Sequence, residues 1–209
     1  MIGIVDYGMG NLRSVESAFE AIGQETSVIR DPRELADVQA IVLPGVGAFG
    51  DGMKNLHETG FVDVLSDEVI RKGKPYLGIC LGLQFLGEKS LEHGEHDGLG
   101  WITGTVRRIE PESAQYRVPH IGWNDLQIEI KEPLFKNLED GPIFYFVHSY
   151  YFDVSPEDSS VIAATCWHGQ KIVAAVQRGN IFGVQFHPEK SQRSGLCLLR
   201  NFVEQALKE

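Results

Sequence analysis

The chain has 209 residues, 43% of them hydrophobic and 23% charged, proportions typical of a globular domain with a substantial core. A formal net charge of -10 argues against nucleic-acid binding, because phosphate contacts need a surplus of Lys and Arg. The cysteines Cys80, Cys166 and Cys197 are widely spaced and match neither a disulfide scaffold nor a zinc site. We expect a single domain over residues 1–209, with no metal and no cofactor.

The hydropathy pattern excludes a membrane protein. The most apolar stretch, residues 76–87, falls short of the roughly 18 residues that a membrane span needs, and it contains Gln84. The first residues have no basic start and reach Asp6 too early for a signal peptide. With cysteines that suit a reducing compartment, we expect a cytoplasmic protein that does not contact a membrane.

In the first half, short runs rich in Ile and Val alternate with amphipathic segments, which is typical of βα units around a parallel sheet. Strands are expected at Ile2–Val5, Ala40–Leu43 (counted as the third) and Tyr76–Ile79. Helices are expected at residues 11–23 and 61–69, and another helix is expected to start after a capping residue at Asp31.

The second half, from Trp101 to Phe186, is strand-like with little helical periodicity. Strands are expected at 106–109, 143–151, 172–177 and 181–186, and a closing amphipathic helix at 196–206. The fold class is therefore α/β: an open, mainly parallel central sheet with helices on both faces, plus additional antiparallel strands in the second half.

Cys80 lies in the sequence Gly78-Ile79-Cys80-Leu81-Gly82, which has the form of a strand-to-helix elbow that carries a nucleophile. The small flanking residues permit a tight turn, and the N–H of Leu81 at the start of the following helix can bind an oxyanion. The alternative is a small buried hydrophobic residue, which is how most lone cysteines behave. The elbow alone does not decide between them.

His187 and Glu189 follow the expected strand 181–186, with Pro188 between them. Pro188 favours an extended His187, so both side chains project toward one side of the chain. Glu189 can then fix the imidazole tautomer while the other ring nitrogen accepts the Cys80 proton. An imidazolium about 4 Å from the sulfur could favour the thiolate by up to ~4 kcal/mol before desolvation opposes it.

The segment Pro44–Gly50 contains the pattern G-x-G-x-x-G, so dinucleotide binding must be considered. It follows the third strand and not the first, a proline precedes it, and no helical pattern starts cleanly behind it. These features favour the alternative, in which residues 45–47 are a flexible strip of N–H groups beside Cys80 that supplies a second oxyanion donor.

The other histidines have simpler interpretations. His93 and His96 lie in a polar, glycine-rich stretch without metal-site spacing, which favours a solvated loop. His57, His120 and His168 are expected to be isolated. His148 follows the apolar run that starts at residue 143, and either faces a substrate or marks a strand end.

Together, Gly78–Gln84 and His187–Ser191 resemble the class I (triad) glutamine amidotransferases, over essentially the whole chain. Within that class, five further segments resemble the glutaminase subunits of imidazole glycerol phosphate synthases, a family of histidine biosynthesis. These segments are residues 6–11, 44–47, 97–101, 120–124 and 148–150. One difference is Leu83, where many relatives carry Met, and we expect it to change only the packing.

This resemblance implies a flavodoxin-like fold and a reaction in which Cys80 attacks the side-chain amide of L-glutamine, releases ammonia and leaves a thioester for hydrolysis. It also implies roles for other residues: Leu81, Val46 and Gly47 in the oxyanion hole, Gln84, Gly45, Ser149 and Tyr150 in glutamine binding, and Trp123, Tyr145 and Lys190 at a partner interface. The implied partner is a cyclase subunit with a (βα)8 barrel, which forms a heterodimer with this chain and receives ammonia through a tunnel.

Three alternatives remain open. Another amidotransferase subunit, of the anthranilate or aminodeoxychorismate type, would share the triad, although the residues around Trp123 argue against it. A self-sufficient γ-glutamyl hydrolase would need no partner. A catalytically silent binding subunit would not need an intact set of Cys80, His187 and Glu189.

Overall fold

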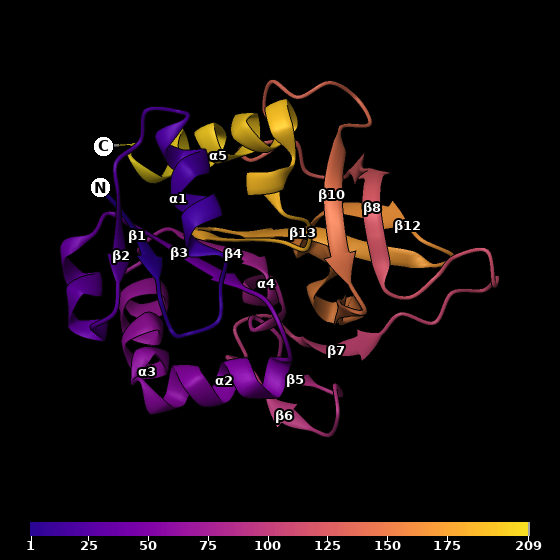
Figure 1. The fold of residues 1–209 in the computed structure, drawn as a ribbon, viewed down its shortest axis with the longest axis horizontal. Helices are drawn as coiled ribbons and strands as arrows, with labels where there is room; N and C mark the ends of the chain where they lie inside the picture. Colours follow the sequence, from indigo (N-terminus) through magenta and orange to yellow (C-terminus); the bar gives the residue numbers. More distant parts are fainter. Residues whose placement is uncertain (209) are drawn as a thin grey trace.

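The computed structural model describes residues 1–208 and contains a central eight-stranded sheet (Figure 1). In spatial order the strands are β2 (Thr26–Ile29), β1 (Ile2–Val5), β3 (Ala40–Gly45), β4 (Tyr76–Cys80), β14 (Ile181–Val184), β13 (Lys171–Arg178), β12 (Ile162–Trp167) and β9 (Gln127–Ile128). The first five are parallel to one another, and each of the last three runs antiparallel to its neighbour.

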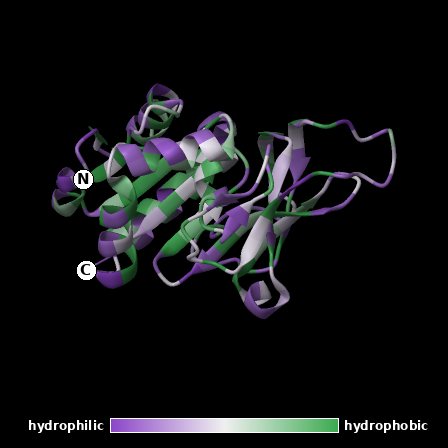
Figure 2. Cartoon of the chain, turned by 90° about the horizontal axis from the view of Figure 1, so that it is seen from below, coloured by the Kyte–Doolittle hydropathy of each residue, from purple (hydrophilic) through white to green (hydrophobic). Residues whose placement is uncertain are grey.

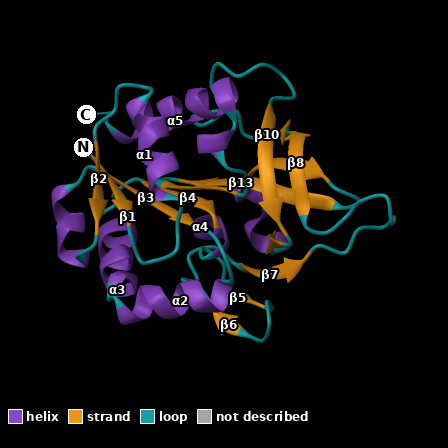
Figure 3. Cartoon of the chain, in the orientation of Figure 1, coloured by secondary structure: helices purple, strands orange, loops and turns teal. Residues whose placement is uncertain are grey.

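Helices cover both faces of the parallel part of the sheet (Figure 3). Helices α1 (Leu12–Glu20) and α5 (Gln192–Ala206) pack on one face, and α2 (Phe49–Glu58) and α3 (Phe61–Ser66) on the other, with a single π-helical turn, η2 (Asp67–Arg71), extending α3. The expected fold class is therefore confirmed. No helix within residues 1–208 is long and apolar enough to span a bilayer.

Alternation along the strands divides the core into two clusters. On β3, Ala40 and Val42 pack with α1 and α5, whereas Ile41 and Leu43 pack with α2 and α3. All six residues of this strand are buried, which explains the continuous apolar run in its sequence. Colouring by hydropathy shows apolar strands between helices with polar outer faces (Figure 2).

Residues 89–154 add two smaller sheets beside the antiparallel edge of the large one. One pairs β8 (His120–Asp125) with β10 (Ile143–His148), and the other contains β11 (Tyr150–Val154), β7 (Gly104–Arg108), β5 (Lys89–Ser90) and β6 (His96–Asp97). The single strand expected over 143–151 was wrong. It divides at Ser149, because β10 pairs with β8 while β11 pairs with β7 in a different sheet.

Two local expectations also need correction. Asp31 accepts a hydrogen bond from the Arg33 N–H (3.0 Å) as an N-cap would, but the element that follows is a short 3-10 helix, η1 (Pro32–Asp37). Helix α2 begins at Phe49, so a helix does follow the glycine-rich segment directly. The position of that segment after the third strand still distinguishes it from a dinucleotide loop.

Candidate active site

A pocket of about 330 Å³ opens where the parallel strands β3, β4 and β14 end. The carboxyl ends of neighbouring parallel strands meet at one edge of the sheet, which is where sites gather in open α/β folds. The opposite wall comes from the smaller sheets, so the pocket lies between the two parts of the fold. Its lining includes Val46, Gly47, Cys80, Leu81, Gln84, Ser149, Tyr150 and His187 among the residues expected from the sequence, and His148, for which a substrate-facing position was one of two expectations. Glu92, Pro119 and Val147 line it in addition.

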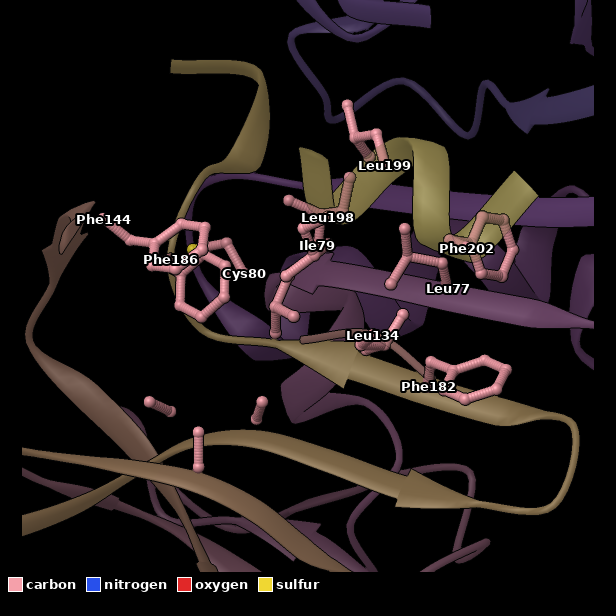
Figure 4. Packing of buried hydrophobic residues seen from close by; sticks show 14 of the residues in the cluster. Leu77, Ile79, Cys80, Leu134, Phe144, Phe182, Phe186, Leu198, Leu199 and Phe202 are labelled. Atoms are coloured by element: carbon pink, nitrogen blue, oxygen red, sulfur yellow. The ribbon is translucent and has the colours of Figure 1, made fainter. Parts of the chain in front are cut away.

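Cys80 ends strand β4 at the expected elbow. Its backbone has φ 55° and ψ -105°, an unusual conformation for a residue with a Cβ. The flanking glycines are required: a Cβ on Gly78 would overlap the Gly82 carbonyl, and one on Gly82 would overlap the carbonyl oxygen of Leu43. Figure 4 shows the Cys80 side chain beside Phe144 and Phe186, with the elbow packed on the core.

Helix α4 (Leu81–Gln84), which follows Cys80, has only four residues. A helix of one turn has a small macrodipole, so its electrostatic effect at Cys80 comes mainly from the nearest N–H groups. Gln185, on the neighbouring chain segment, donates from Nε2 to the Cys80 sulfur at 3.6 Å. This contact could not be predicted from the sequence, because it depends on the pairing of β14 with β4.

His187 and Glu189 are joined by a hydrogen bond of 2.7 Å between Nδ1 and Oε1, and their side chains are 3% and 1% exposed. The main chain of His187 is fixed as well: its N–H donates to the Tyr145 carbonyl (2.9 Å) and its carbonyl accepts from the Ser191 hydroxyl (2.6 Å). The structure thus brings the two residues together in the orientation expected from the sequence.

The second ring nitrogen of His187 has no hydrogen-bond partner within residues 1–208, and the ring lines the pocket with Cys80. Burial lowers the pKa of this imidazole, but its interactions with Cys80 and Glu189 outweigh that effect and raise the pKa to about 10. His187 is therefore an imidazolium at neutral pH, and Glu189 is placed to stabilise its charge.

Only part of the glycine-rich strip, residues 45–47, lines the pocket. Val46, 41% exposed, and Gly47, with φ 95°, line the pocket near Leu81. Gly45 does not line it but lies beneath, where a Cβ would approach that of Leu81 to 2.8 Å and overlap the Tyr7 hydroxyl. Close packing thus explains the glycine at position 45, and the left-handed backbone explains the one at position 47.

Gln84 uses its side-chain amide within the protein. Nε2 donates to the Tyr150 carbonyl (3.0 Å) and to Oε1 of Gln185 (3.1 Å). Ser149 and Tyr150 form the wall opposite Cys80, at the break between β10 and β11. Gln84 therefore holds this wall in place, in addition to any contact with a ligand.

Glu92 contributes a carboxylate to the pocket that was not expected from the sequence. Its Oε2 accepts a hydrogen bond from the Phe49 N–H (2.7 Å) at the start of α2, just beyond the glycine-rich strip. The residue lies between strands β5 and β6, in the polar stretch interpreted as a solvated loop. Its role depends on how that loop folds back over the pocket, which local sequence does not reveal.

The three residues expected at a partner interface lie on one side of the molecule. Trp123 on β8 and Tyr145 on β10 are directly opposite in the strand register, with ring centroids 5.8 Å apart, and Trp123 is 50% exposed. Lys190 is exposed at the end of the short helix η4 (Pro188–Lys190), next to Ser191, whose hydroxyl accepts from the Tyr145 N–H (3.0 Å).

The histidines expected to be isolated are not all so. His57 lies on α2, but His120 bonds to His148 and stacks on His168. No group of His, Cys, Asp and Glu side chains in the described part of the chain is arranged to hold a metal ion.

The model of the family "Glutamine amidotransferase class-I" matches residues 3–206. The imidazole glycerol phosphate synthase subunit HisH of Geobacter sulfurreducens is 51% identical over 97% of this chain and 98% of its own length, and that of Aquifex aeolicus 50% identical over 98% and 97%. A solved glutamine amidotransferase structure superposes with a TM-score of 0.74 at 22% identity (98% of both chains), and PurLQS from Thermotoga maritima with 0.72 at 21% (98% and 97%), which shows a shared fold. The chain belongs to the class I glutamine amidotransferase family.

Proposed function

We propose that this chain is the glutaminase subunit of imidazole glycerol phosphate synthase, which hydrolyses L-glutamine to glutamate and ammonia in histidine biosynthesis. The observation that carries the proposal is one pocket lined by Cys80 at a strained elbow and by His187 held by Glu189, in a chain about 50% identical to HisH subunits over nearly its full length. No cofactor is needed for this reaction.

Cys80, His187 and Glu189 act as the catalytic triad in this proposal. The Cys80 thiolate attacks the side-chain carbonyl carbon of glutamine, and the imidazolium of His187 gives its proton to the departing nitrogen, so ammonia leaves and a γ-glutamyl thioester remains. Neutral His187 then takes a proton from water, whose oxygen attacks the thioester. The tetrahedral intermediate then expels the Cys80 thiolate, which restores its ion pair with protonated His187. The new carboxyl group of glutamate releases its proton to solvent.

The oxyanion of each tetrahedral intermediate is assigned to backbone N–H groups of Leu81 and of Val46 or Gly47. Loss of one such donor typically slows a reaction by ~10² to 10³-fold. The left-handed Gly47 allows the strip to change conformation at low steric cost, and in this proposal partner binding favours the rotated conformation that completes the hole.

The pocket also suits the amino-acid end of glutamine. The carboxylate of Glu92 complements the α-ammonium group by charge, and the backbone at Ser149 and Tyr150 offers N–H groups to the α-carboxylate. Gln84 supports this wall, and Gly45 allows the strip to pack closely behind Leu81.

The partner in this proposal is a cyclase subunit with a (βα)8 barrel, bound as a heterodimer in the cytoplasm. Its docking surface is the outer face of β8 and β10, where Ile121, Trp123 and Ile143 are each at least half exposed. An exposed apolar face of this kind marks an interaction site, and an acceptor bound there would receive ammonia close to where the pocket releases it.

The test is the variant Cys80→Ala in the complex with its cyclase partner. We expect it to abolish glutamine-dependent synthesis of imidazole glycerol phosphate and to leave synthesis from added ammonium salts intact, because the acceptor chemistry belongs to the partner. Loss of both activities in an assembled complex would contradict the division of labour. A silent binding subunit would lose neither.

The same assay separates the remaining alternatives. A self-sufficient γ-glutamyl hydrolase would release glutamate at equal rates alone, with cyclase, and with cyclase plus the acceptor nucleotide. A subunit of the anthranilate or aminodeoxychorismate type would form no complex with the cyclase. We expect instead a chain that is nearly idle alone and activated when both cyclase and nucleotide are present.

A further inference from the structure

Three histidines outside the proposed triad form a cluster between the glutamine pocket and strand β8. Nδ1 of His120 lies 3.0 Å from Nε2 of His148, and Nδ1 of His148 lies 2.8 Å from the Tyr150 carbonyl oxygen. The His120 ring stacks between His168, at a centroid distance of 4.0 Å, and Phe146, at 4.7 Å. His120 and His148 are 3% and 7% exposed, so water contributes little to their hydrogen bonding.

These contacts fix the position of every proton. The Tyr150 carbonyl only accepts, so His148 must carry its proton on Nδ1 and present Nε2 as an acceptor. His120 must then donate to it from Nδ1, which leaves Nε2 of His120 to accept from the Asn124 amide at 3.3 Å. The other N–H of that amide donates to the Trp167 carbonyl (2.9 Å), which sets its orientation.

A second proton on either ring would break this chain, because two N–H groups would then face each other. Burial lowers the pKa of His120 to about 3, with His148 and His168 adding to the effect. Burial likewise lowers the pKa of His148 to about 4; the bond to Tyr150 opposes this, while His168 and His187 reinforce it. The pocket is thus lined by the charged imidazole of His187 and the neutral imidazole of His148, and the neutral ring of His120 is hydrogen-bonded to His148.

The series of hydrogen bonds from Asn124 through His120 and His148 ends at the Tyr150 carbonyl, in the pocket wall formed by Ser149 and Tyr150. The carbonyl accepts from His148 and also from Nε2 of Gln84, so it is held from two directions. Ser149 is fixed on its other side, because its carbonyl accepts from the Ile109 N–H at 2.9 Å. The wall that faces Cys80 is therefore built with little freedom to move.

We propose that His148 and His120 are positioning residues for glutamine: His148 holds the Tyr150 carbonyl, and His120, oriented by Asn124, keeps the proton of His148 on Nδ1. Neither ring takes part in proton transfer. The role of these hydrogen bonds in glutamine binding rests on the proposed glutaminase function. The protonation pattern of the two rings does not depend on it.

The protonation pattern is tested directly by long-range ¹H–¹⁵N correlation spectra of the full chain with ¹⁵N-labelled histidine at pH 7. We expect His148 and His120 both as neutral rings protonated on Nδ1, and His187 as a doubly protonated ring. A spectrum with His148 protonated on Nε2, or with either ring charged, would overturn the proposal. This result stands whether or not the chain hydrolyses glutamine.

The positioning role is tested by kinetics of the complex with cyclase and nucleotide. His120→Phe keeps a ring in the stack but removes the donor to His148, and we expect it to raise the KM for glutamine about three- to ten-fold with little change in kcat, as loss of one supporting hydrogen bond would. His120→Asn, whose amide can occupy the Nδ1 position, should return KM toward the wild-type value. His168→Phe preserves the stack and should leave KM unchanged.

A merely structural role gives a different pattern. It would lower the active fraction, and so kcat and the rate at which iodoacetamide alkylates Cys80, while KM stayed constant. Unchanged KM in His120→Phe, or an equal rise in His168→Phe, would overturn the proposal. If the wild-type complex itself released no glutamate, the proposed function would have failed instead, and the spectra alone would decide the protonation pattern.

Discussion

At the scale of single residues, Cys80 is held in a strained backbone conformation at the edge of the pocket. Its backbone conformation costs a residue other than glycine roughly 1–3 kcal/mol, and the structure can maintain it only because the chain on both sides is tightly packed. This conformation places the Cys80 sulfur in the pocket that the His187 imidazole also lines, where it accepts one hydrogen bond from Gln185.

This environment predicts selective chemistry among the three cysteines. Cys80 should react rapidly with an electrophilic glutamine analogue, since it alone lines the pocket with a charged imidazole. Burial raises the pKa of Cys166 to about 12, so that thiol should be inert. Mass spectrometry of the modified peptides measures the three rates in one experiment, with Cys80→Ala as the control. Equal labelling of Cys166 or Cys197 would show that Cys80 is not activated.

The residues nearest the proposed chemistry were predictable because each lies within a short motif whose local geometry is restricted. The elbow places Cys80, and Pro188 places His187 relative to Glu189. His120 and His148 were not predictable as a pair, because their contact depends on the antiparallel register of β8 with β10. No local pattern in the sequence specifies that register.

At the scale of elements, the pocket depends on strand ends more than on helices. Strands β3, β4 and β14 each place a functional segment at their carboxyl ends, and their buried apolar runs made them recognisable from sequence. The break between β10 and β11 was missed because aromatic residues continue on both sides of Ser149 and a single serine is a weak turn signal. What separates them is the choice of different partners, a tertiary effect.

The interlock of the elbow with β3 predicts a severe effect for Gly82→Ala. Its Cβ would overlap the carbonyl oxygen of Leu43, a backbone atom that cannot move without disturbing the sheet. We expect the free energy of unfolding to fall by on the order of 4 kcal/mol or more. Urea unfolding followed by circular dichroism measures it.

Gly73→Ala is the matched control for this experiment. Gly73 lies just before strand β4 and has open space around it, so only its positive φ of 74° opposes a side chain. That conformation should cost about 1 kcal/mol. Similar losses in the two variants would mean that the interlock with Leu43 is not what makes position 82 sensitive.

At the scale of the whole molecule, the net charge of -10 and the exposed apolar face of β8 and β10 distinguish two kinds of surface. On this face Trp123 and Tyr145 lie side by side, and Ile121 and Ile143 are exposed beside them. Exposed aromatic residues on a rigid sheet lose little conformational entropy on binding, and such residues often dominate the energy of an interface.

Trp123→Ala should therefore weaken association with the cyclase by about 30-fold or more, the effect of a typical hot-spot residue. The control is Ile70→Ala on η2, which removes a side chain of similar exposure (53% against 50%) from another part of the molecule. Titration calorimetry with purified cyclase measures both. An affinity that is unchanged in Trp123→Ala, or reduced equally in Ile70→Ala, would place the interface elsewhere.

The pairing of β14 with β4 has a consequence for folding during synthesis. It sets Ile181 beside Tyr76 and so brings His187 to Cys80, although the whole of residues 81–180 lies between those strands. Contacts this distant in sequence form late, and synthesis from the N-terminus delays them further. A growing or truncated chain thus contains Cys80 without His187 beside it. In the proposed function, such a chain does not hydrolyse glutamine until translation is nearly complete.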